Sequence, residues 1–205
     1  MAASPSLWIT TLSDIFLWLT ALYTACQLFK DHRAPALGLF LLCSTAGLCS
    51  LPVSSPALNC IQRELEWAGG VLAPALVSFG FLWLSQDRST AHVLLLGSAL
   101  LMVLHDWLSP EALVLMSRCL ALSSLSCSLT VCLFTANVAG AFASVALSLP
   151  ALVAPVPGAI AFTPLVSTEV AEGYLKCLLK GLMAIGCLST KPALGKYLQD
   201  FTEWD

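Results

Sequence analysis

The sequence predicts an all-α, polytopic transmembrane helical bundle with seven spans. Hydrophobic residues make up 58% of the 205 residues and charged residues only 10%, whereas about a quarter of an ordinary soluble domain is charged. So few charges cannot cover a water-facing surface. Several apolar stretches reach the roughly 20 residues that a helix needs to cross the hydrocarbon core, where each backbone donor and acceptor must be satisfied within the segment.

The predicted bundle occupies residues 1–190, and a polar C-terminal tail follows at 191–205. We place the spans at residues 6–29, 35–52, 65–84, 91–108, 112–135, 138–155 and 168–188. No internal repeat and no shift in composition indicates a second domain. The alternative architecture has six spans, with the last stretch lying at the membrane surface as an interfacial helix.

The first two spans are bounded by charge, proline and turn-forming residues. The N-terminus lacks the basic region of a secretory signal, so the first span is expected to be retained. It stops at "KDHRAP", residues 30–35, because proline breaks a continuing helix. The second span, "ALGLFLLCSTAGLCSLPV", ends in the turn-forming "SSPALN".

The middle spans have recognisable ends. Trp67 and Trp83 lie near the two ends of the third span, as interfacial anchors do, and the fourth, "HVLLLGSALLMVLHDW", ends at "LSPE". From Cys119 to Thr168 no residue is charged. That length suits two spans and a connection, so we divide it near Asn137–Gly140 and expect "VPGAIAFTP" to be a loop or a shallow re-entrant segment.

The seventh stretch, "EVAEGYLKCLLKG" at residues 169–181, carries a narrow row of charges. Glu172, Lys176 and Lys180 recur at every fourth position, and Glu169 lies one step earlier on the same side. A surface-lying helix usually has a broad polar face rich in Lys and Arg, so a spanning helix is favoured. Its charged row must then face the bundle or a wet cavity, because a charge in hydrocarbon costs about 2.5 kcal/mol or more.

The depth of each residue along its helix, at 1.5 Å per residue, indicates a partner for the charged row of the seventh stretch. Lys176 would lie roughly 12 Å below the end of a helix that starts at Thr168, and Asp14 reaches a similar depth in the first span. We therefore predict an intramembrane pair of Asp14 with Lys176. The alternative is that Asp14 pairs locally or snorkels and that Lys176 is satisfied by Glu172 on its own helix.

The same arithmetic groups further polar residues in the outer half of the bundle, if the N-terminus is outside. This candidate polar cluster comprises Glu66, His105, Asp106, Arg118, Glu169, Glu172 and Lys180. It is either a site or the ordinary charged rim of a helical bundle, because helix ends are where charges cost least in membranes.

Small residues recur every four positions on two spans and predict helix-packing faces. The sixth span carries Gly140, Ser144 and Ser148, and the fifth carries Ser124 and Ser128. Such faces let helices approach closely. The serine-rich segment of the fifth span has the alternative of lining a polar pathway, although serine hydroxyls there can also bond carbonyls of their own helix.

The sequence offers no sign of catalysis or of cofactor, metal or nucleic-acid binding. The nine Lys and Arg are scattered, without a basic patch, and there is no Cys pair of the zinc type, no G-x-S-x-G, no P-loop and no dinucleotide fingerprint. Ser98, His105 and Asp106 are a superficial echo of the alkaline ceramidase-like membrane hydrolases. With only three histidines in the chain, the histidine-rich zinc site of those enzymes cannot be assembled.

In overall character the chain resembles the small, poorly characterised multi-pass "transmembrane protein" families of vertebrates, and this resemblance brings no functional residues with it. We predict a non-catalytic interaction or assembly component of the membrane, with the lipid bilayer and other membrane proteins as partners. A small transporter or channel that uses the polar cluster is the alternative, and a lipid-modifying enzyme the third. Lys30, Arg33, Arg88, Lys191 and Lys196 fall on one side of the membrane and Arg63 and Arg118 on the other, a modest bias that favours an outside N-terminus. No address motif identifies the membrane.

Overall fold

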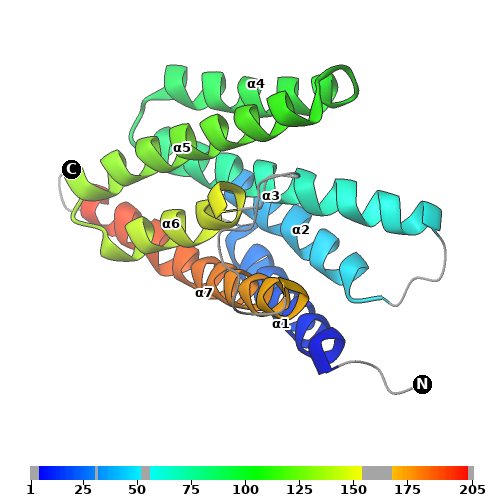
Figure 1. The fold of residues 1–205 in the computed structure, drawn as a ribbon. Coiled ribbons are helices and arrows are strands. Elements are labelled where there is room, and N and C mark those ends of the chain that lie inside the picture. Colours follow the sequence, from blue (N-terminus) through cyan, green and yellow to red (C-terminus); the bar gives the residue numbers. More distant parts are fainter. Residues whose placement is uncertain (1–4, 31, 52–55, 154–167, 203–205) are drawn as a thin grey trace.

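The computed structural model describes residues 5–30, 32–51, 56–153 and 168–202, and all its regular elements there are helices (Figure 1). They are α1 (Pro5–Leu28), α2 (Arg33–Cys49), α3 (Pro56–Leu84), α4 (Arg88–Leu104), the short 3-10 helix η1 (His105–Trp107), α5 (Pro110–Phe134), α6 (Val138–Val153) and α7 (Thr168–Thr202). The all-α prediction is confirmed for these ranges. The predicted loop "VPGAIAFTP" lies outside the described residues.

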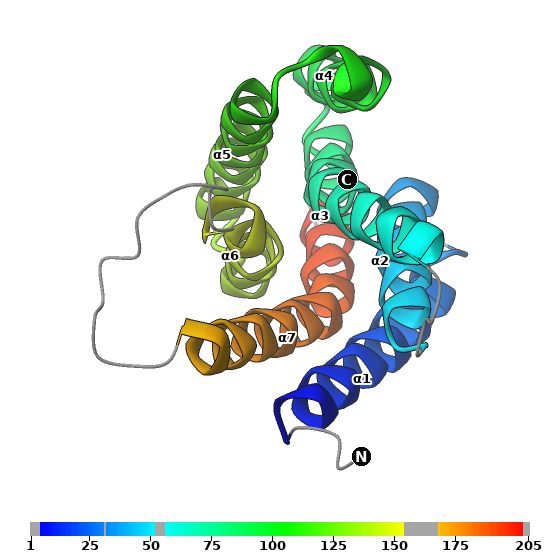
Figure 2. The same ribbon diagram turned by 45° about the vertical axis from the view of Figure 1, so that its right-hand side comes forward.

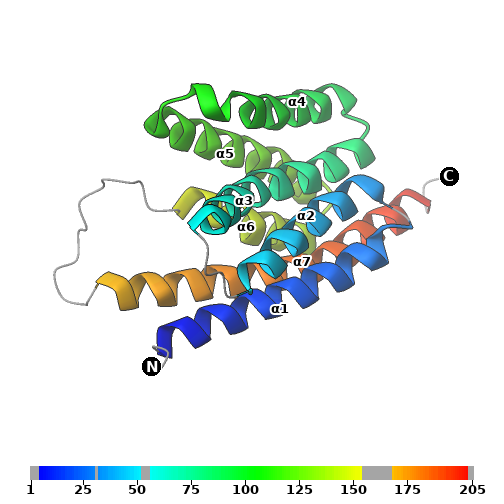
Figure 3. The same ribbon diagram turned by 90° about the vertical axis from the view of Figure 1, so that its right-hand side faces the viewer.

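The helices lie side by side with alternating direction (Figure 3). α1 packs on α2 and α7, α2 on α3, and α6 on α5 and α7, while α3 also contacts α5 and α6. α4 has its main helix contacts with α3 and α5, so it lies at one side of the molecule, away from α1 and α7 (Figure 2). α3 therefore lies at the centre of the bundle, and α4 lies at its periphery.

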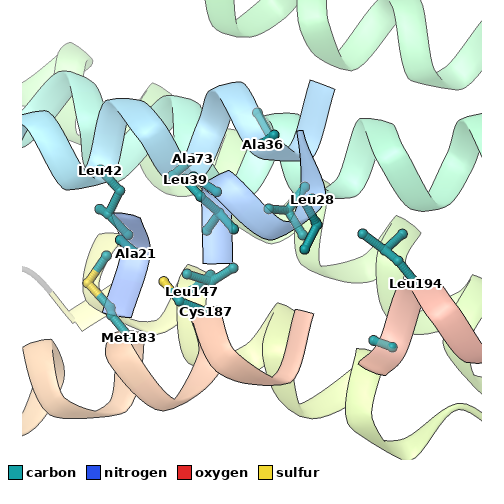
Figure 4. Packing of buried hydrophobic residues seen from close by; sticks show 14 of the residues in the cluster. Ala21, Leu28, Ala36, Leu39, Leu42, Ala73, Leu147, Met183, Cys187 and Leu194 are labelled. Carbon is teal, nitrogen blue, oxygen red and sulfur yellow. The ribbon is translucent and has the colours of Figure 1, made fainter. Parts of the chain in front are cut away.

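The core is built largely from small and branched aliphatic side chains. The residues labelled in Figure 4 come from α1, α2, α3, α6 and α7: Ala21, Leu28, Ala36, Leu39, Leu42, Ala73, Leu147, Met183, Cys187 and Leu194. Alanine allows close approach of neighbouring helices. At Gly186 of α7 an added Cβ would lie 2.8 Å from the Cβ of Ala146 on α6, so this crossing tolerates no side chain there.

Among the described residues, five helices are long and apolar enough to cross a membrane by length and composition. Their apolar windows are Trp8–Leu28, Cys60–Leu84, Arg88–Trp107, Pro110–Phe134 and Gly173–Gly195. α2 and α6 are shorter apolar helices, with lengths of about 26 and 24 Å at 1.5 Å per residue. The described residues form seven α-helices and η1, and the lengths of α2 and α6 are close to the lower limit for a span.

The two largest differences from the predicted boundaries are at the start of α3 and at the end of α7. α3 begins at Pro56 rather than at residue 65, and the Gln62 side-chain amide on this extra length donates to the Leu48 carbonyl near the end of α2 at 2.5 Å. α7 continues to Thr202, so the predicted polar tail 191–205 is helical as far as that residue. The physical reason is burial, because Ala193 and Leu194 are packed in the core.

Candidate functional site

The most connected charged group in the described residues lies where α1, α3 and α7 meet. Lys180 Nζ is 2.5 Å from Asp14 Oδ1 and 3.2 Å from Glu66 Oε1. The side chains of Asp14 and Lys180 are 7% and 17% exposed, whereas that of Glu66 is 52% exposed. We call these residues the triad. The Lys180 ammonium group contacts both carboxylates, and each member of the triad comes from a different helix.

The members of the triad lie at matching depth because α1, α3 and α7 run in the same direction (Figure 3). At 1.5 Å per residue they are about 9 to 11 Å from the nearer ends of the apolar windows of their helices. Ionisable groups that deep in an apolar segment normally face the bundle and pair with one another. Asp14 and Lys180 do both.

The predicted Asp14–Lys176 pair is replaced by a pair one helical turn further along. Lys176 is exposed, and Lys180 occupies the position beside Asp14. The sequence-based depths assumed that the two helices begin level, but α7 starts further out than α1 (Figure 3). A lysine later in α7 therefore lies level with Asp14.

The structure brings only part of the candidate polar cluster together. Glu66 and Lys180 are in contact. His105 Nδ1 lies 3.0 Å from Asp106 Oδ1, and the His105 ring is tilted against that of Trp67 at 5.0 Å between centroids. Because Trp67 follows Glu66 on α3, this second pair lies beside the triad rather than in it. Arg118 is half-buried on α5, and the side chains of Glu169 and Glu172 lie outside the described part.

The predicted packing residues of α5 join α5 to α3. Ser124 and Ser128 are buried. The Ser78 hydroxyl on α3 donates to the Ser124 carbonyl at 3.0 Å and lies 3.3 Å from the Ser128 hydroxyl. Ser128 also donates to the carbonyl of Ser124 in its own helix at 2.6 Å. These hydroxyls therefore serve contact between neighbouring helices.

The predicted packing residues of α6 are likewise buried: Gly140, Ser144 and Ser148. A Cβ added at Gly140 would lie 2.7 Å from Cys132 Sγ on α5 and 3.2 Å from the Phe81 ring on α3. The Ser144 hydroxyl donates to the Gly140 carbonyl at 2.8 Å. Both small-residue faces are thus filled by helices of the same chain, so they are not free for a partner.

Sequence reasoning used Asn137 only as a boundary and missed its role. Its buried side chain donates from Nδ2 to the Ala193 carbonyl at 2.6 Å, and its Oδ1 accepts from the Gly140 N–H at 3.0 Å. The amide thus fastens the α5–α6 turn to α7. The available signal was that Asn137 is the one amide side chain between Cys119 and Thr168.

No group of three or more His, Cys, Asp or Glu able to hold a metal ion occurs in the described ranges. The arrangement at the triad can balance charge and hold three helices together. Any function assigned to the triad must rest on these two properties.

Comparison with known proteins identifies the family. The chain is 32% identical over 133 residues to mouse transmembrane protein 276, and the match covers 65% of this chain and 68% of the relative. The rat protein of that name is 34% identical over 135 residues, with coverage of 65% and 68%, and the human one 31% identical over 141 residues, with coverage of 68% and 72%.

No family model matches the chain. No solved structure matches it either. The predicted resemblance to a vertebrate transmembrane protein family is confirmed by the three relatives. The chain is a membrane protein that belongs to the transmembrane protein 276 family.

Proposed function

We propose that the protein crosses the bilayer several times and acts there as a non-catalytic interaction component. Several crossings are supported by the five long apolar helices and by the short helices α2 and α6, which pack between them. The end of α1 and the starts of α2 and α4 lie at one end of the bundle (Figure 3). Lys30 follows α1, Arg33 and Arg88 begin α2 and α4, and Lys191 bonds to Gln27 near the end of α1. By the positive-inside rule this end faces the cytoplasm and the N-terminus lies outside.

The observation that carries the interaction role is the peripheral position of α4. Only 22% of its apolar window is buried within the chain, compared with 56% for α3. Its outward face exposes large aliphatic side chains: Val93, Leu96, Leu100 and Val103. The small-residue faces of α5 and α6 are filled internally, whereas the outer face of α4 is open to another membrane protein.

Photo-crosslinking in native membranes tests this role. A photoreactive residue placed at Leu96 or Val103 is expected to give a discrete larger product that contains a second protein. The matched control is Leu12, which is similarly exposed on α1, and it is expected to give lipid adducts. Lipid adducts alone at all three positions would contradict an interaction role for α4.

A small transporter is the second candidate, and the triad favours it because ionisable residues at membrane depth often mark ion or proton pathways. The test is to measure ion or proton flux across the membrane of liposomes that contain the purified protein. The transporter predicts flux for the natural chain and its loss in Asp14→Asn at equal reconstitution. Equal leak from liposomes with and without the natural protein would exclude this candidate.

A further inference from the structure

Two aromatic side chains of α3 and two side chains of α4 form a cluster where these helices join. Phe79 and Trp83 lie one turn apart on α3 and are stacked, with 5.4 Å between ring centroids and 22° between ring planes. The His92 ring stands edge-on to both, at 6.0 Å from Phe79 and 5.8 Å from Trp83. The guanidinium carbon of Arg88 lies over the Trp83 ring, 5.1 Å from its centroid. We call these four residues the aromatic–basic cluster.

Arg88 is held in place without a carboxylate partner. An indole face is a favourable position for a guanidinium, and the His92 Nδ1 donates to the Arg88 carbonyl at 2.5 Å. The neighbouring Asp87 is engaged by Thr90, whose backbone N–H and hydroxyl donate to its carboxylate at 3.2 and 2.6 Å. The described residues contain no ion pair between Arg88 and a carboxylate. Because Arg88 is exposed, its N–H donors are open to the surroundings.

The aromatic–basic cluster lies at the level where the apolar parts of α3 and α4 end. Trp83 is the last residue but one of the apolar window Cys60–Leu84, and Arg88 is the first residue of the window Arg88–Trp107. With α3 and α4 across the bilayer, this level coincides with the lipid headgroups, where tryptophan rings and the charged ends of arginines are typically found. The surroundings of Arg88 are then headgroups and water.

Phosphate is the headgroup acceptor that suits an arginine in this setting, because a guanidinium presents its N–H donors in a planar fork that matches phosphate oxygens. We propose that the aromatic–basic cluster binds the phosphate of an anionic phospholipid, with Arg88 as the donor and Trp83 holding the guanidinium in position. An anionic headgroup is preferred to a zwitterionic one, which brings its own cation to compete for the phosphate. The positive-inside rule puts this end of the bundle at the cytoplasmic leaflet, which is rich in anionic lipids.

The inference rests on the proposed crossing of the bilayer by α3 and α4, but not on a partner at the outer face of α4. Release of the chain from membranes by alkaline carbonate would contradict the crossing itself. A chain that stays in the membrane and binds anionic lipid no better than Arg88→Gln would contradict only the lipid site. The crosslinking outcome at Leu96 and Val103 does not depend on this site.

Native mass spectrometry of the purified full chain, titrated with lipid in detergent, tests the proposal. The natural chain is expected to bind its first phosphatidylglycerol about fivefold more tightly than Arg88→Gln, the factor that one basic residue contributes at an anionic surface. Trp83→Leu is expected to weaken this binding although Arg88 is intact, because the guanidinium loses the ring that holds it. Phosphatidylcholine should bind the natural chain and Arg88→Gln alike. Inorganic phosphate should not displace phosphatidylglycerol, because the acyl chains also hold the lipid.

The matched control is Arg63→Gln, which removes another exposed arginine, near the start of α3, and should leave the affinity for phosphatidylglycerol unchanged. Equal affinity of Arg88→Gln and the natural chain, or an equal loss in Arg63→Gln, would overturn the proposal. Unchanged binding by Trp83→Leu would reduce Arg88 to a general surface charge, and displacement by inorganic phosphate would overturn the assignment to a lipid. Arg88 and Trp83 are both exposed, so neither substitution opens the core. If Trp83→Leu nevertheless does not fold, the comparison of Arg88→Gln with Arg63→Gln decides.

Discussion

The region where α1, α3 and α7 meet and the α4–α5 side use helices of similar apolar character in different ways. The first holds Lys180 between the buried Asp14 and the half-exposed Glu66, and α1, α3 and α7 bury 33%, 56% and 44% of their apolar windows. α4 and α5 bury 22% each. Hydropathy does not distinguish the two regions. The neighbours of each helix decide whether a polar side chain is tolerated, because a neighbouring helix supplies partners that lipid lacks.

α5 shows this difference within one helix. Its serines Ser124 and Ser128 face α3 and are buried, while Leu115, Leu122 and Leu133 are exposed. The exposed face also carries Ser126 and Thr130, and there the Thr130 hydroxyl donates to the Ser126 carbonyl of its own helix at 2.8 Å. Substitutions in the two regions should consequently differ in cost, and the following predictions run from the largest expected effect to the smallest.

Removal of the triad's cation should be the most damaging change. Lys180→Met leaves two carboxylates without their counter-charge, and breaking a buried ion pair from one side typically costs about 3–5 kcal/mol. We expect most of the protein to lose its folded, monodisperse form in detergent, measured by size-exclusion chromatography and thermal unfolding. Lys176→Met on the exposed face of the same helix should stay within about 0.5 kcal/mol. Equal behaviour of the two variants would remove the triad from the account.

A methyl group at the α6 crossing should have the next largest effect. Gly140→Ala drives its Cβ against Cys132 and Phe81, and overpacking of this kind costs about 1–3 kcal/mol. The control is Gly70→Ala on α3, where nothing lies within 4 Å of the added Cβ, so the gain in helix propensity should leave stability unchanged or raised. The measurement is thermal unfolding in nanodiscs, and a stable Gly140→Ala would contradict the tight crossing.

Loss of the buried amide should loosen α7 locally. Asn137→Ala leaves the Ala193 carbonyl and the Gly140 N–H without this partner, at a cost of about 1–3 kcal/mol. We expect faster hydrogen exchange in the second half of α7, measured by mass spectrometry. Gln27→Ala, which removes the exposed contact of Gln27 with Lys191, should change exchange little. Unchanged protection of α7 in Asn137→Ala would show that the amide does not hold it.

The smallest effect is expected at the start of the peripheral helix α4. The Thr90 hydroxyl and backbone N–H donate to Asp87 and lower the pKa of that carboxyl from its usual value. Its capping contribution is therefore present at neutral pH and lost as the pH falls through the lowered pKa. Asp87→Ala should slightly lower the melting temperature at neutral pH, and the difference from the natural chain should vanish in strong acid. A difference that grows in acid would contradict this sign.

The general architecture followed from the sequence because it depends on local features. The uncharged stretch from Cys119 to Thr168 was too long for one span, and the structure breaks it between Phe134 and Val138. The need of Asp14 for a cationic partner followed in the same way from its apolar surroundings. Each of these two predictions needed only the sequence of one segment and the assumption that lipid surrounds it.

What the sequence could not supply is the offset between helices. Lys176 and Lys180 lie on the same helical row, and only the outward start of α7 selects Lys180 for Asp14. Likewise, Gly140 and Gly70 look equivalent in sequence, but only Gly140 faces a neighbour. Both facts are set by packing between segments that are distant in the chain, which no local pattern records.

A double-mutant cycle on Asp14 and Lys180 tests most directly whether these residues form one charged unit inside the bundle. Unfolding free energies would be measured in nanodiscs for Asp14→Asn, Lys180→Met and the double variant, with Lys176→Met as the parallel cycle. We predict a coupling of about 0.5–3 kcal/mol for Asp14 with Lys180, and additivity for Asp14 with Lys176. Additivity in the Lys180 cycle, or coupling to Lys176 instead, would contradict the account.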